Sequence, residues 1–87
     1  MKTKTTEEIP RRICTDDRLK QLRKLGYKTT GYDRDMEKIL TKKGYDLPVI
    51  TENDSWKFQT GKYTRIMLNR ADCLAEALIL LKELKLI

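Results

Sequence analysis

Apolar side chains near the start of the chain recur at a helical spacing. Leu19, Leu22 and Leu25 follow one another every three residues, and this spacing predicts one narrow apolar stripe on a short helix. Thr15 is well placed to cap the start of this helix, and Gly26 is expected to end it. A helix of about ten residues is marginal in isolation, so its leucine stripe has to pack on another element.

A second helix is predicted after the Thr29-Thr30-Gly31 break. Its apolar positions have the spacing i, i+4, i+7 and i+8 and are Tyr32, Met36, Ile39 and Leu40. Asp33 is the expected N-cap, and Gly44 follows the basic last turn. Both helices end in a Lys–Gly–Tyr type of sequence, but their apolar faces do not superpose, which indicates shared capping and not an internal repeat.

Three strands are predicted between residues 47 and 68. The first spans 47–51, with Pro48 suited to an edge position, and the others span 56–60 and 63–68 on either side of Gly61-Lys62. A two-residue loop that opens with glycine is typical of a type II′ hairpin. The resulting register pairs Trp56 with Met67, Phe58 with Arg65 and Thr60 with Tyr63 on the core face, and Lys57 with Ile66 and Gln59 with Thr64 on the other.

The last helix carries more apolar residues than one buried face needs. Asn69 is its expected N-cap, and its main apolar face consists of Cys73, Leu74, Ala77, Leu78, Leu81 and Leu84. Ile79 and Leu80 lie off this face, so the helix either packs between two layers or meets a partner. The lead hypothesis is an exposed protein interface formed by Ile79, Leu80, Leu86 and Ile87.

These elements predict an α+β fold with the order α-α-β-β-β-α, in which helices pack on a three-stranded antiparallel sheet. Residues 1–12 are predicted to be a flexible basic N-terminal arm, and residues 13–87 a single α+β domain.

Composition argues against catalysis. The 87 residues include no His, two Cys and a single Ser, so neither Cys14 nor Cys73 has a histidine base to activate it. Two cysteines are also too few for a structural zinc site. The four glycines are scattered and form no phosphate-binding loop. We therefore expect a protein that is not an enzyme and has no metal, no cofactor and no small-molecule substrate.

The sequence favours a cytoplasmic protein. Its longest apolar run, Ala77–Leu81, is far shorter than a membrane span, and Met1–Pro10 has no apolar core of a signal peptide. In a reducing cytoplasm the two cysteines are expected to be free thiols, with a single disulfide in an exported protein as the alternative.

The charge of the chain is uneven. The formal net charge is +6, and residues 1–28 hold nine of the 19 basic side chains against four acidic ones. An alternative function is therefore nucleic-acid binding by a basic surface that comprises Arg11, Arg12, Lys20, Arg23, Lys24 and Lys28. The competing interpretation is an ordinary solvated helix face.

Residues 32–85 share the element order of the double-stranded RNA-binding domain. That family holds phosphates with a run of lysines at the start of its last helix. Here the matching stretch is Asn69-Arg70-Ala71-Asp72-Cys73, with one base and one acid, so the RNA-binding activity is not carried over.

Three segments resemble short phage and prophage proteins of the phage ABA-sandwich type. They are the helix from Tyr32-Asp33 to Leu40, the strand Ser55-Trp56-Lys57-Phe58, and the helix start Asn69-Arg70-Ala71-Asp72-Cys73-Leu74-Ala75-Glu76-Ala77-Leu78. The resemblance covers about 55 residues and brings no catalytic residues with it. It implies a mobile-element origin and a location in the host cytoplasm.

The sequence thus predicts a small non-enzymatic binding or regulatory protein that acts by protein–protein contact, including self-association or inhibition of a host factor. Nucleic-acid binding is the alternative, and a structural role in a phage particle is a third hypothesis.

Overall fold

The computed structural model of the chain describes residues 12–87. Its elements are α2 (Asp16–Lys24), α3 (Asp33–Lys42), β1 (Val49–Ile50), β2 (Trp56–Thr60), β3 (Tyr63–Met67) and α4 (Arg70–Glu83). The order α-α-β-β-β-α and the α+β class are those predicted. The prediction of a flexible arm over residues 1–12 falls almost wholly on residues outside the described part.

The sheet has the strand order β1-β2-β3, and both pairings are antiparallel. The predicted hairpin register is confirmed, from Trp56 opposite Met67 to Thr60 opposite Tyr63. Gly61 has a φ of +56°, the sign that the first loop position of a type II′ turn requires. β1 is shorter than the predicted strand 47–51, because Pro48 has no N–H to give to a ladder.

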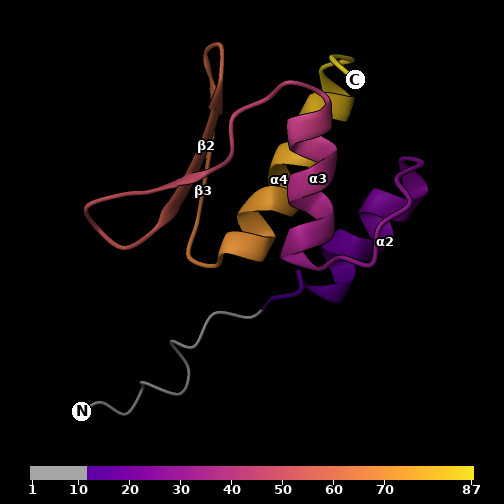
Figure 1. Cartoon of the computed structure of the whole chain (residues 1–87), viewed down its shortest axis with the longest axis horizontal. Coiled ribbons are helices and arrows are strands. Elements are labelled where there is room, and N and C mark those ends of the chain that lie inside the picture. The colour runs from indigo at the N-terminus through magenta and orange to yellow at the C-terminus, as the bar shows by residue number, and fades with distance from the viewer. Residues whose placement is uncertain (1–11) are drawn as a thin grey trace.

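α4 lies between the sheet and the other helices. It contacts β2 and β3 on one side and α2 and α3 on the others, and α2 lies across α4 from the sheet (Figure 1). Ten of its 14 residues are buried. The main core is therefore built around one helix, with Phe58 from the sheet, Leu22 from α2, and Met36 and Leu40 from α3.

The prediction that Ile79 and Leu80 form an exposed interface is wrong. Ile79 is 4% exposed and Leu80 is 2% exposed. Ile79 follows Asp72 by seven residues, and Leu80 follows Cys73 by seven residues. Seven residues make about two turns of helix, so the two members of each pair lie on nearly the same helix face. Ile79 lies above Asp72, which bonds to Thr15 next to α2, and Leu80 lies above Cys73, which faces β2 and β3. Each of these two side chains thus packs in a different layer of the fold.

The caps agree with the sequence at two of three helices. The Asn69 side chain accepts hydrogen bonds from the backbone N–H groups of Ala71 and Asp72, and Thr15 occupies the N-cap position of α2. The N-cap of α3 is Tyr32 and not Asp33, which is the first helical residue. Asp33 still stabilises the helix start, because its negative charge lies in the first turn.

Matched leucine truncations test the burial of α4. Leu80→Ala should lower the free energy of unfolding by about 3 kcal/mol, because it opens a cavity in a closed core. Leu68→Ala, at a residue that is 83% exposed, should change it by less than about 0.5 kcal/mol. Urea unfolding at low protein concentration measures both values. Equal small losses would show that Leu80 is not in the core.

Candidate interaction surfaces

One face of the sheet is left uncovered. Within residues 12–87, α4 is the only helix that contacts the strands, and it packs on the face that carries Phe58 (Figure 1). Side chains alternate between the two faces of a strand, so every second residue of β2 and β3 points away from α4. We call the face turned away from α4 the outer face.

The outer face carries an apolar patch. Val49 pairs with Lys57, and Lys57 pairs with Ile66, so these three residues form one row across β1, β2 and β3. Val49 is 61% exposed and Ile66 is 57% exposed. Leu68 directly follows β3 and is 83% exposed. We call Val49, Lys57, Ile66 and Leu68 the outer patch.

Polar groups border this patch. Lys57 is half-buried between two apolar neighbours, where its aliphatic stem covers apolar surface while the ammonium group reaches water. Gln59 and Thr64 are exposed and pair with each other in the next row. The outer patch thus has exposed apolar side chains on either side of Lys57, with polar residues in the next row.

The sequence contained a signal for this surface that the interface prediction did not use. The predicted register had already assigned Ile66 to the face opposite Phe58, next to Lys57 and Gln59. An isoleucine on an otherwise polar strand face is the mark of a contact surface. Val49 and Leu68 could not be added, because their exposure depends on where β1 and the turn into α4 lie in space.

The two C-terminal residues of the predicted interface behave differently from each other. Leu86 is 50% exposed, whereas Ile87 is half-buried and packs against the core. The Tyr45 hydroxyl donates to the Leu86 carbonyl oxygen at 3.4 Å, which ties this end of the chain to the segment after α3. The structure therefore does not bring the four predicted interface residues together on one surface.

The basic residues of the alternative prediction are accessible. Arg11 lies outside the described residues, and the five others, Arg12, Lys20, Arg23, Lys24 and Lys28, are exposed. None of these five forms an ion pair within residues 12–87. Asp16 and Asp17 are also exposed at the start of the same helix, so the α2 surface has mixed charge.

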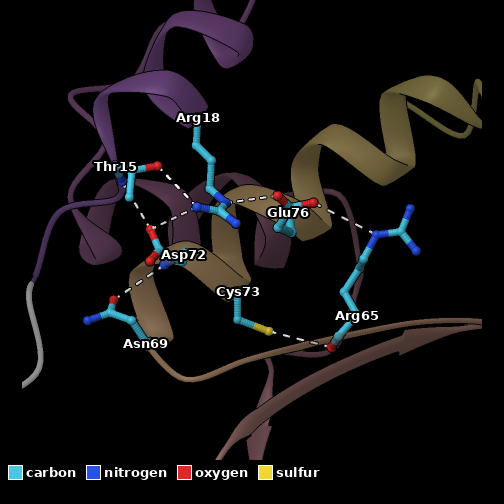
Figure 2. Close-up of polar contacts among 7 residues, drawn as sticks. All are labelled: Thr15, Arg18, Arg65, Asn69, Asp72, Cys73 and Glu76. Carbon is cyan, nitrogen blue, oxygen red and sulfur yellow. Dashed lines mark hydrogen bonds and ion pairs between the residues drawn. The ribbon is translucent and has the colours of Figure 1, made fainter. Parts of the chain in front are cut away.

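Arg18 is the remaining basic residue of α2, and it points toward α4 (Figure 2). Its Nε lies 2.8 Å from Glu76 Oε2, and its Nη1 lies 3.8 Å from Asp72 Oδ1. Asp72 Oδ1 also accepts a hydrogen bond from the Thr15 backbone N–H at 3.0 Å. Arg65 Nε on β3 lies 3.8 Å from the other Glu76 oxygen. This Arg18 cluster joins α2, α4 and β3 through charges that are only partly exposed.

Arg70 makes the corresponding connection on the other side of α4. Its guanidinium pairs with Asp33 and Glu37 of α3 and lies 5.5 Å from the centre of the Trp56 ring on β2. A cation over an aromatic face adds about 0.5–1 kcal/mol at a partly exposed position. The contacts of Arg65 with Glu76 and of Arg70 with Trp56 hold the sheet on α4, with the outer patch on the face turned away from the helix.

Neither cysteine is disulfide-bonded, as expected for free thiols, and both are buried. Cys73 Sγ lies 3.5 Å from the Trp56 carbonyl oxygen and 3.8 Å from that of Arg65. The pKa of the Cys73 thiol is raised from 9.0 to about 11, chiefly by burial; the Glu76 charge also raises this pKa, whereas a backbone hydrogen bond from Phe58 and the Arg70 charge lower it. A nucleophilic cysteine needs a lowered pKa, so the Cys73 thiol contributes packing and not reactivity.

Within residues 12–87, no helix is both long and apolar enough to cross a membrane. The same residues contain no group of three or more Cys, Asp or Glu side chains arranged to hold a metal ion. Comparisons of the chain with protein-family models, with curated proteins and with solved structures find no match. The functional argument therefore rests on the surfaces themselves.

The pKa of Cys73 predicts a loss of stability at alkaline pH. The unfolded chain loses the thiol proton near pH 9.0, whereas the folded chain keeps it to about pH 11. The stability that this group contributes is complete below about pH 9 and falls as the pH rises to about 11. Urea unfolding under reducing conditions should show this fall, and Cys73→Ala should show a shallower one. Identical pH profiles for the two proteins would contradict the prediction.

Proposed function

We propose that this protein is a small non-enzymatic binding or regulatory module that contacts a protein partner through the outer patch. The observation that carries the proposal is the row of Val49, Lys57 and Ile66 on a sheet face that no helix of residues 12–87 covers. Val49 and Ile66 on this face are more than half exposed, and exposing apolar groups to water is unfavourable, which favours their burial by a partner.

The residue types of the patch suit binding. Val49 and Ile66 are β-branched, and their side chains are already restricted within a strand. Such residues lose little rotamer freedom when a partner covers them, which lowers the entropic cost of association. The surface is presented by a sheet whose Arg65 pairs with Glu76 of α4 and whose Trp56 ring lies against Arg70 of α4, so the sheet is held on α4 before binding.

Other features support the non-enzymatic part of the proposal. The sequence has no histidine, and the pKa of Cys73 is raised to about 11, which keeps its thiol protonated at neutral pH. Two free thiols fit a protein that works in the reducing cytoplasm. The resemblance to short phage proteins adds a class of partner, because such proteins often act on a host protein.

Nucleic-acid binding is the second candidate. Its support is the group of unpaired, exposed cations on α2, Lys20, Arg23 and Lys24. The exposed Asp16 and Asp17 weaken it, because they would repel the same phosphate backbone that these cations attract. Arg18 adds nothing to this surface, since its guanidinium is bound to Glu76.

Site-specific photo-crosslinking in the organism that encodes the protein tests the two candidates together. The photoreactive p-benzoylphenylalanine is introduced in place of Ile66 on the outer patch or, as the matched control, in place of Lys24 on α2. Both positions are exposed, so neither change disturbs the core.

The proposal predicts discrete protein adducts from position 66 and at most weak background from position 24. Absence of protein adducts at position 66 would contradict it. Nucleic-acid adducts at position 24, lost when the salt concentration is raised, would favour the alternative instead.

A further inference from the structure

β3 forms an open edge of the sheet. Among the helices and strands of residues 12–87, it contacts only β2 and α4. The other edge, β1, is two residues long and follows Pro48, two features that discourage pairing with another chain. β3 has five residues, no proline and an uninterrupted register with β2. A strand of this kind presents a row of backbone groups to any second strand that fits.

The hairpin determines which backbone groups point outward. A two-residue loop makes its flanking residues, Thr60 and Tyr63, a hydrogen-bonded pair, and hydrogen-bonded pairs then recur at every second position. Tyr63, Arg65 and Met67 therefore direct their backbone N–H and C=O groups toward β2. Those of Thr64 and Ile66 point to the open edge.

A side-chain contact agrees with this assignment. The Thr64 carbonyl oxygen accepts a hydrogen bond from Arg65 Nη1 at 3.1 Å, on the exposed side of the strand. This oxygen is thus available to donors outside the hairpin. If another donor replaces Arg65 Nη1 at the Thr64 carbonyl oxygen, the guanidinium keeps an ion-pair partner, because Arg65 Nε lies near Glu76.

We propose that the occupant of this edge is the β3 strand of a second copy of the chain, paired antiparallel about a two-fold axis at Ile66. In this register Ile66 lies opposite Ile66 of the second copy, and the outward N–H and C=O groups of the two isoleucines bond to each other. Thr64 lies opposite Leu68 of the second copy on the outer face. The side chain of Arg65 lies opposite that of Met67 on the inner face.

Charge and geometry favour this register over its neighbours. An axis at Arg65 would also use the outward backbone groups of Thr64 and Ile66, but it would place the two arginines opposite each other, which is destabilising. An axis at Thr64 would place Ile66 opposite Lys62 in the hairpin loop. The axis at Ile66 uses the free backbone groups and places an isoleucine opposite an isoleucine.

The net charge of the chain does not oppose this contact. Residues 45–69 carry three acidic and three basic side chains, so the region around the sheet is neutral despite the overall +6. The exposed cations Lys20, Arg23 and Lys24 lie on α2, across α4 from the sheet (Figure 1). Two copies can therefore approach edge to edge with little electrostatic repulsion.

Pairing at β3 joins the two outer patches into one surface. The rows of Val49, Lys57 and Ile66 from both copies become continuous across a six-stranded sheet. The inference rests on the proposed function and deepens it, because it names a second copy as the protein that meets this edge and doubles the surface open to any further partner.

Engineered cysteines test the pairing and its register in the purified full chain. Ile66→Cys places two thiols opposite each other at a Cα separation of about 5.5 Å, within the disulfide range. Thr64→Cys is the matched control, because its two copies would lie about 13 Å apart along the strands. Both positions are exposed, and the native thiols are buried, which keeps background cross-linking low.

Mild oxidation should convert most of the Ile66→Cys protein to a covalent dimer and leave the Thr64→Cys and unaltered proteins without a covalent cross-link. Efficient cross-linking of Thr64→Cys alone, or only of a Thr64→Cys and Ile66→Cys mixture, would overturn the assigned register.

Sedimentation of the unaltered protein over a range of concentrations gives an independent measure. Ile66→Lys should weaken dimerisation at least about 10-fold, since it sets two ammonium groups opposite each other. Val49→Lys changes the same face away from the edge and should leave dimerisation unchanged. A protein that stays monomeric at every concentration overturns the inference. In that case, photo-adducts of position 66 with a different protein would still support the proposed function. The absence of such adducts would contradict both the proposed function and the dimer.

Discussion

The burial of α4 on nearly every side is the constraint on which the rest of the structure depends. Ten of its 14 residues are removed from water, so the helix needs cover from more than one layer. The sheet supplies one layer, and α2 and α3 supply the others. Each of these elements is itself amphipathic and buries only one side. The sheet buries the face that carries Phe58 against α4, and its opposite face is left to water or to a partner.

Two arginines set the orientation of these layers. Arg18 joins α2 to the Asp72 and Glu76 carboxylates of α4, and Arg70 joins α4 to α3 and to the Trp56 ring. Apolar packing alone is nondirectional, whereas paired charges fix how one element lies on the next. As a result, the outer patch and the basic surface of α2 lie on opposite sides of α4.

Local chemistry made much of the fold predictable from sequence. The Gly61-Lys62 loop and the alternation of Trp56 and Phe58 determine the hairpin register, and Asn69 marks the start of α4. The location of the interface could not be predicted in the same way. A helix that is apolar all round fits both a core helix and a partner-binding helix, and only the position of α2 and the sheet shows that Ile79 and Leu80 belong to the core. The exposure of Val49 and Leu68 likewise depends on tertiary placement.

Backbone hydrogen exchange tests the central claim most directly, namely that α4 is enclosed while the β3 edge is open. At low protein concentration the amides of α4 should exchange slowest, Arg65 should be protected by its pairing with β2, and Ile66 should exchange fast. Raising the concentration should protect Ile66 and leave Arg65 unchanged. Slow exchange at Ile66 that does not depend on concentration, together with fast exchange within α4, would contradict the account.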